Sequence, residues 1–104
     1  MAREKYKTLT EQMFYVLLCL RNECCGIDIM RMVAEITENR VTIGPGTLYI
    51  LLDNFVSENI IVETKVEKRK KSYIITNVGK EMLDKEYKRL HFLINDFERI
   101  NKGE

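Results

Sequence analysis

The stretch Gly44-Pro45-Gly46 constrains the fold most, because it fixes where a helix begins. Pro45 suits the first turn of a helix, where its missing N–H would have no partner, and Gly44 leaves the chain free to turn just before it. The apolar residues that follow have the i, i+3, i+4, i+7, i+8 spacing of a helix that packs one face on a core: Leu48, Leu51, Leu52, Phe55 and Val56. We therefore predict an amphipathic helix from Pro45 to about Glu58.

The opposite face of this helix carries Thr47 and Tyr49 near its N-terminus. Such side chains are placed to meet base edges in a DNA groove, while backbone N–H groups near Gly44 and Gly46 are placed to meet phosphates. An ordinary amphipathic helix after a turn explains the same residues. Both interpretations stay open on this stretch alone.

The chain has 104 residues, of which 45% are hydrophobic, so its size and composition are those of one globular domain. Its formal net charge of +1 does not indicate a nucleic-acid partner, which requires only a local basic patch. We expect a cytoplasmic protein, because the sequence has no apolar run of membrane-spanning length and no apolar segment of a secretory signal.

Two helices are expected before the Gly-Pro-Gly helix. The first runs from about Thr10 to Arg21 behind a capping-box pattern, and its middle, Met13–Leu20, is apolar nearly all round. Such a helix needs cover on more than one side, either from a partner subunit or from a fully internal position. A turn at 22–25 leads to a second helix over 26–37, and a minimal strand is expected at 41–43. The inner face of the second helix is predicted to hold Ile27, Met30, Val33 and Ala34.

A β-hairpin is predicted after Asn59, which suits the left-handed conformation at a helix end. Alternating residues over 60–66 and 71–75 indicate its two strands, with Tyr73 and Ile75 on one face. Between them the tip is highly charged. Between Lys65 and Lys71 the sequence has one acid, Glu67, and five cations: Lys65, Lys68, Arg69, Lys70 and Lys71.

The last predicted helix runs from about Val78 to Ile100, with a frayed tail after it. Apolar residues recur along it with the 4, 3, 4, 3 spacing of a heptad seam: Leu83, Tyr87, Leu90, Ile94 and Phe97. We interpret it as a dimerisation helix and expect Phe14 and Leu18 to join the same interface. Folding back on its own domain is the alternative.

This order of elements predicts a mostly α fold with a small β-hairpin wing, namely a winged helix–turn–helix domain over 1–76 and a long C-terminal dimerisation helix over 77–104. In such a domain the third helix enters the major groove and the wing lies beside it. We expect the cations of the wing tip and the lead segment to contact phosphates: Lys68, Arg69, Lys70, Lys71, Lys5 and Lys7.

The sequence also resembles the PadR family of winged-helix transcriptional regulators, in its short form with a single C-terminal helix. The resemblance lies in Leu9-Thr10-Glu11, Gly26–Met30, Gly44–Tyr49, Tyr73, Thr76 and Gly79. It implies a homodimeric repressor whose operator is released by a small-molecule or stress signal. The chain departs from the usual family pattern at Cys25, Ile27 and Asn59.

An effector site is expected where the last helix meets the first helix of the partner. Its candidate lining is Phe14, Leu18, Tyr87, Leu90 and Ile94, although such residues are more often plain interface packing.

Catalytic and metal chemistry have little support. The single His91 lacks a nucleophilic partner, and the cysteines Cys19, Cys24 and Cys25 show no Cys-x-x-Cys spacing. We therefore predict no enzyme, no cofactor and no metal. Two alternatives to a simple repressor remain, a protein–protein assembly module and a regulator that senses redox state through Cys24 or Cys25.

Overall fold

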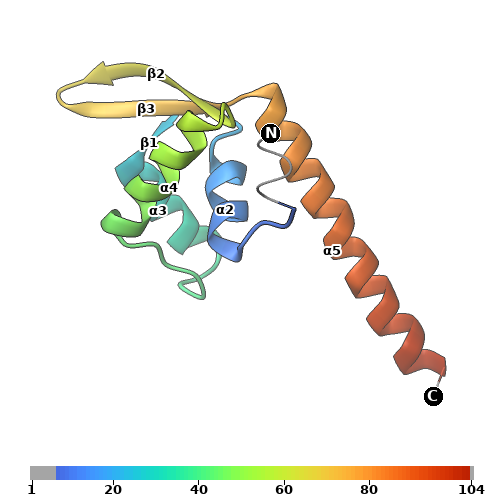
Figure 1. Cartoon of the computed structure of the whole chain (residues 1–104). Helices are drawn as coiled ribbons and strands as arrows, with labels where there is room; N and C mark the ends of the chain where they lie inside the picture. Colours follow the sequence, from blue (N-terminus) through green and yellow to red (C-terminus); the bar gives the residue numbers. More distant parts are fainter. Residues whose placement is uncertain (1–6, 104) are drawn as a thin grey trace.

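The computed structural model describes residues 7–103 and shows a cluster of three short helices, a protruding hairpin and one long projecting helix (Figure 1). The protein is mostly helical with a small antiparallel sheet whose strand order is β1-β3-β2, which confirms the predicted fold class. The elements in chain order are α2 (Glu11–Cys19), β1 (Cys24–Cys25), α3 (Gly26–Ile36), α4 (Pro45–Ser57), β2 (Ile61–Glu67), β3 (Lys70–Ile75) and α5 (Asn77–Gly103). No helix in this described part is long and apolar enough to cross a membrane.

Local signals in the sequence set the helix starts. The Thr10 hydroxyl accepts a hydrogen bond from the Met13 N–H at 3.1 Å, and α4 begins with Gly44 as N-cap and Pro45 in its first turn. The core lies where α2, α3 and α4 meet under the sheet. Its largest fully buried side chains include Leu17, Leu20, Ile29, Leu48, Leu52, Phe55 and Ile60.

The segment predicted as a turn at 22–25 contains a short strand instead. Cys24 and Cys25 pair with Tyr73 and Ser72 of β3, so this strand exists only because the hairpin lies beside it. The strand predicted at 41–43 is wrong, because that segment is an irregular connection with Val41 buried. The Thr37 hydroxyl holds it by accepting the Val41 N–H at 3.1 Å and donating to the Val33 carbonyl at 2.8 Å.

The buried face of α3 also differs from the prediction. Ile29 is fully buried and Val33 with it, whereas Ile27 has 51% of its surface exposed. Ile27 lies one residue after Gly26, at the start of the helix, where it faces the hairpin side and not the core.

The junction between the hairpin and α5 is built around Thr76. Its hydroxyl lies 2.7 Å from the Asn59 carbonyl and 2.9 Å from the Ile60 carbonyl, and it also accepts the Gly79 N–H at 3.2 Å. Asn59 has φ of 60°, the left-handed conformation expected for it. This network joins the end of α4 to the start of α5.

We expect Gly79→Ala to destabilise the protein by at least about 2 kcal/mol. A Cβ at position 79 would lie 2.4 Å from the Ile60 carbonyl oxygen and 2.6 Å from the Ile75 Cγ1, so backbone would have to move. Urea unfolding measures the loss. Gly103→Ala is the matched control, since nothing lies within 4 Å of its added Cβ. Equal stability of both variants would contradict this packing.

The first half of α5 packs against α2, and the second half extends away from the cluster (Figure 1). From His91 to Lys102 every described side chain of α5 is exposed. The frayed tail predicted after Ile100 is wrong, because the helix continues to Gly103. Its exposed apolar residues include Ile94, Phe97 and Ile100.

A buried carboxylate fastens α5 to the segment before α2. Glu86 is 4% exposed, forms an ion pair with Arg89, and accepts the Leu9 N–H at 3.2 Å. The hydrogen bond from Arg89, helped by that from Leu9, holds the pKa of Glu86 below its usual value.

This lowered pKa predicts an acid-sensitive contribution to stability. Because the folded-state pKa lies below the unfolded value, the contribution is full above the ordinary glutamate pKa of about 4.5 and is lost as pH falls through the folded value. We expect Glu86→Gln to remove this part of the pH dependence, so that its free energy of unfolding falls less between about pH 6 and pH 3 than that of the wild type. Urea unfolding across this range provides the measurement, and parallel curves would show that Glu86 has no part in it.

Candidate nucleic-acid interface

The exposed face of α4 is the first component of the interface. Thr47 and Tyr49 both lie on it, and Leu48 between them is fully buried, as the apolar spacing predicted. Gly44 and Gly46 are exposed, and a Cβ at either position would meet no atom within 4 Å. The start of α4 is therefore an open surface that another molecule can approach closely.

The wing tip is a two-residue turn between β2 and β3. Glu67 pairs with Lys70, which leaves Lys68 and Arg69 as the turn residues, with φ of 49° and 67°. Hairpin turns of this kind favour asparagine and glycine, because positive φ costs other residues of the order of 1 kcal/mol. The chain thus keeps two long cations where glycine would be more stable.

The five cations of the hairpin do not have equal electrostatic surroundings. Lys65 lies 3.6 Å from Glu23 and 3.5 Å from Glu67, and Lys71 lies 3.6 Å from Glu63. Within residues 7–103 no carboxylate lies within 4 Å of the three remaining cations, Lys68, Arg69 and Lys70. These three form the unpaired charge of the wing tip.

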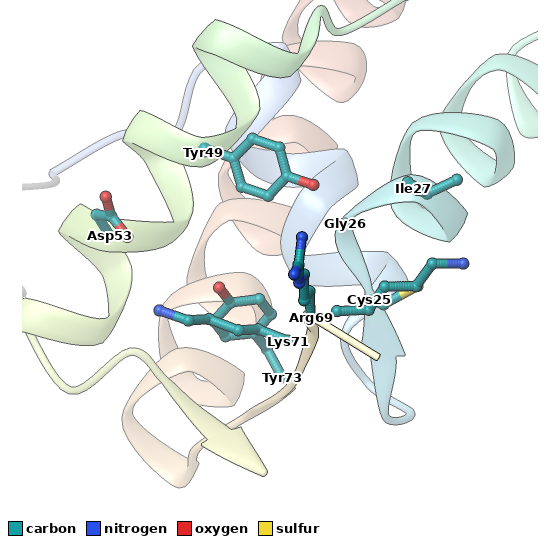
Figure 2. A pocket seen from close by; sticks show the side chains of 9 residues that line it. Cys25, Gly26, Ile27, Tyr49, Asp53, Arg69, Lys71 and Tyr73 are labelled. Carbon is teal, nitrogen blue, oxygen red and sulfur yellow. The ribbon is translucent and has the colours of Figure 1, made fainter. Parts of the chain in front are cut away.

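A notch of about 430 Å³ lies between α4, the wing and the start of α3. Figure 2 shows Tyr49 pointing from α4 toward Gly26, with Arg69, Lys71 and Tyr73 on the wing side. A Cβ on Gly26 would lie 2.8 Å from the Tyr49 hydroxyl, so the glycine makes room for this ring. Sequence reasoning placed Tyr49 on the exposed face but missed Gly26, whose role depends on the packing of α3 against α4.

The lead segment is described only in part. Lys7 is exposed, whereas Lys5 lies outside the described residues. Lys7 does not line the notch.

Cys19 and Cys24 are poorly suited to thiol chemistry. Burial, with the nearby Asp28 carboxylate, raises the pKa of Cys24 to about 11, which opposes the reactive thiolate. The Cys24 thiol also lies 3.8 Å from the Met32 sulfur. Cys19 is buried as predicted, and burial raises its pKa as well. Among the described residues, no group of three His, Cys, Asp or Glu side chains could hold a metal ion.

The predicted effector residues come together only in part. Phe14, Leu18 and Tyr87 line a hollow of about 480 Å³ between α2 and α5, together with Leu83. Leu90 and Ile94 lie farther along α5 and do not line it. Sequence reasoning missed three charged residues at the hollow: Arg21, Lys80 and Asp84.

Three packed helices followed by a β-hairpin with a cationic tip define a winged helix–turn–helix protein. The chain belongs to the transcriptional regulator PadR-like family, which its sequence matches over residues 16–85. Proteins of this family are DNA-binding transcription regulators and not enzymes, and the chain is therefore a regulator of this kind.

Solved structures share the fold. A transcriptional regulator from Clostridium thermocellum superposes with a TM-score of 0.73 at 16% identity, covering 94% of this chain and 95% of that one. A PadR family transcriptional regulator from Eggerthella lenta gives 0.70 at 21% identity, covering 84% and 74%. The RosR protein of H. salinarum gives 0.64 at 24% identity, covering 90% and 88%. No curated protein matches the sequence.

Proposed function

We propose that the protein is a homodimeric repressor that binds an inverted-repeat operator through α4 and the wing. The observation that carries DNA contact is the wing tip, where Lys68, Arg69 and Lys70 project without a carboxylate partner among the described residues. Arg69 and Lys70 line the same notch as Tyr49 of α4, and Thr47 and Tyr49 lie on the exposed face of that helix. We assign base contacts to that face and phosphate contacts to the tip cations, with Lys71 and the lead lysines Lys5 and Lys7 adding to them.

The dimer is supported by the exposed apolar seam of α5. Tyr87, Ile94 and Phe97 have 54%, 53% and 70% of their surface exposed, and every described side chain of α5 from His91 to Lys102 is exposed. Such a stripe needs a partner, and a second copy supplies one by two-fold symmetry. We assign this interface to Phe14, Leu18, Leu83, Tyr87, Leu90, Ile94 and Phe97, in a division of the chain into a DNA-binding domain over 1–76 and a dimerisation helix over 77–104.

Repression would be relieved by a signal that acts at the same interface. Two α4 helices held by the dimer must lie about 34–36 Å apart to enter successive major grooves. A ligand between the protomers that favours another separation would release DNA, by an amount set by its differential affinity for the two states.

The test is selection of bound duplexes from a random DNA pool, followed by titration of the enriched sequence at two salt concentrations. We expect an inverted repeat with half-sites one helical turn apart, and affinity that falls steeply with salt. Sedimentation equilibrium on the same protein should give a dimer. Failure to enrich any sequence, with weak binding even at low salt, would contradict the proposal and favour a protein–protein assembly module.

Tyr49 offers a local test of the same interface. We expect Gly26→Ala to change stability by no more than about 1 kcal/mol, because the group it displaces is the movable end of a side chain. The displaced ring would no longer occupy the notch, so operator affinity should fall by about tenfold, or roughly 1.4 kcal/mol. Thermal unfolding and operator titration separate the two effects. Unchanged affinity would show that the position of Tyr49 does not matter for binding.

A further inference from the structure

We infer that Ile50 of α4 recognises the C5-methyl group of a thymine in the operator. Ile50 has 64% of its surface exposed, more than the two other exposed large apolar residues of α4, Tyr49 at 43% and Val56 at 37%. It does not belong to the buried core. The inference rests on the proposed function, since it names the base that the exposed face of α4 would select.

Ile50 lies near the centre of the exposed face of α4. With about 3.6 residues per turn, it is rotated by about 140–160° from each of the buried side chains of this helix, Leu48, Leu52 and Phe55. Side chains on a helix lean toward its N-terminus, so that of Ile50 leans toward Gly46, one turn earlier. Gly46 has no side chain to cover it, and a Cβ there would meet no atom within 4 Å. The edge of a base pair can therefore approach Ile50 closely.

The surroundings of Ile50 fit a DNA groove better than a protein surface. Its neighbours on the exposed face of α4 include four polar residues, Thr47, Asp53, Asn54 and Ser57. Protein-docking faces are contiguous apolar patches, whereas this face has one aliphatic side chain among polar ones. The wing tip adds cations beside the helix, since Arg69 and Lys70 line a notch together with Tyr49. These features together suit a polyanion that presents an isolated apolar group.

The major groove of DNA presents such a group. Thymine has a methyl group at C5, whereas the edges of the other bases are read there through hydrogen-bond donors and acceptors. The side chain of Ile50 has no polar atom, so placing it against those donors and acceptors would leave them without hydrogen bonds. The thymine methyl is the group that Ile50 can contact favourably. Each half-site should therefore contain a thymine at a fixed position.

Replacing thymine by deoxyuridine tests the inference, because it removes the methyl group and keeps the hydrogen-bonding pattern of the base. Each thymine of the selected operator is replaced in turn, in both half-sites together. We expect one position at which the affinity of the wild type falls by about tenfold, or about 1.4 kcal/mol, as two methyl groups leave an apolar contact. A half-site without a fixed thymine, or equal affinity for every uracil duplex, would overturn the inference.

The variant Ile50→Ser tests whether this side chain is responsible. It should bind the thymine and uracil operators with affinities within about twofold of each other, because the apolar contact is absent from both complexes. Its urea unfolding should match that of the wild type, since Ile50 is not a core residue and serine has a similar helix propensity. A tenfold preference for thymine that persists in Ile50→Ser would overturn the assignment.

Ile100→Ser is the matched control. Ile100 is 60% exposed and lies in the last turn of α5, whose second half extends away from the cluster (Figure 1), so this variant should keep the tenfold preference for thymine. A protein that binds its operator without preferring thymine to uracil contradicts only the assignment of Ile50. Failure to bind any duplex contradicts the proposed function, and the inference with it.

Discussion

Replacing the three unpaired cations of the wing tip, as Lys68→Gln/Arg69→Gln/Lys70→Gln, is expected to weaken operator binding by roughly 1,000-fold at moderate salt. A dimer would lose six phosphate contacts, so the slope of log affinity against log salt should decrease by about 5. All three side chains are exposed, so the fold should remain intact. Titration at several salt concentrations measures both the affinity and the slope.

The matched control for the wing removes the same net charge elsewhere. Lys85, Lys88 and Arg99 lie on α5, each in an ion pair with an acid of the same helix. Their replacement by glutamine should leave the salt slope within about one unit of the wild type. If both triple variants lose affinity equally, net charge and not the wing position governs binding, and the assignment of the wing to phosphates is wrong.

A second wing variant distinguishes the effect of the turn's backbone conformation on stability from the effect of its charge on DNA binding. Lys68→Asn/Arg69→Gly places residues that tolerate positive φ in the turn, so the hairpin should gain up to about 1 kcal/mol while DNA binding weakens. Opposite changes in stability and affinity would show that the chain keeps a strained tip for its charge. A variant that is more stable and binds equally well would remove that explanation.

The helices and the hairpin could be predicted because their signals are local. The cap at Thr10, Pro45 in the first turn of α4, and the alternation around Tyr73 each depend on residues adjacent in the sequence. The strand at 24–25 could not be predicted, because two residues carry no periodicity and their pairing depends on β3, far along the chain.

Two predictions, the buried face of α3 and the strand at 41–43, were wrong because a local apolar pattern does not show which neighbours a residue will have. Apolar residues at both Ile27 and Ile29 allow two faces of α3, and in the folded chain Ile29 is fully buried whereas Ile27 is half exposed. Similarly, Val41 is a residue typical of strands, but it has no neighbouring strand. Its backbone N–H donates to the Thr37 hydroxyl instead.

The candidate site, too, could be predicted from the sequence only in part. The sequence placed cations in the wing, but the acids that pair with Lys65 and Lys71 became visible only in the folded chain. Arg21 and Lys80 were missed because they meet only through the packing of α2 on α5. Charge counted along the sequence identifies a basic segment, and only the three-dimensional structure shows which charges remain unpaired.

Ile94→Asp/Phe97→Asp is expected to convert the protein to a folded monomer. Both residues lie on the α5 seam and neither contributes to the buried core, so the protomer should unfold at an unchanged urea concentration once dimer dissociation is accounted for. A charge in each half of a two-fold interface would be buried without a partner, which costs several kcal/mol per dimer.

The loss of the dimer should reduce binding to the inverted repeat by at least about 100-fold, because the second half-site would no longer be bound intramolecularly. Phe92→Asp is the matched control. Phe92 is 68% exposed but lies two residues from both Leu90 and Ile94, on the opposite side of the helix from the seam. Sedimentation equilibrium and operator titration should therefore separate the two variants. A dimer that survives Ile94→Asp/Phe97→Asp would show that the seam is not the interface, and a monomer that keeps full operator affinity would show that DNA recognition does not need two copies.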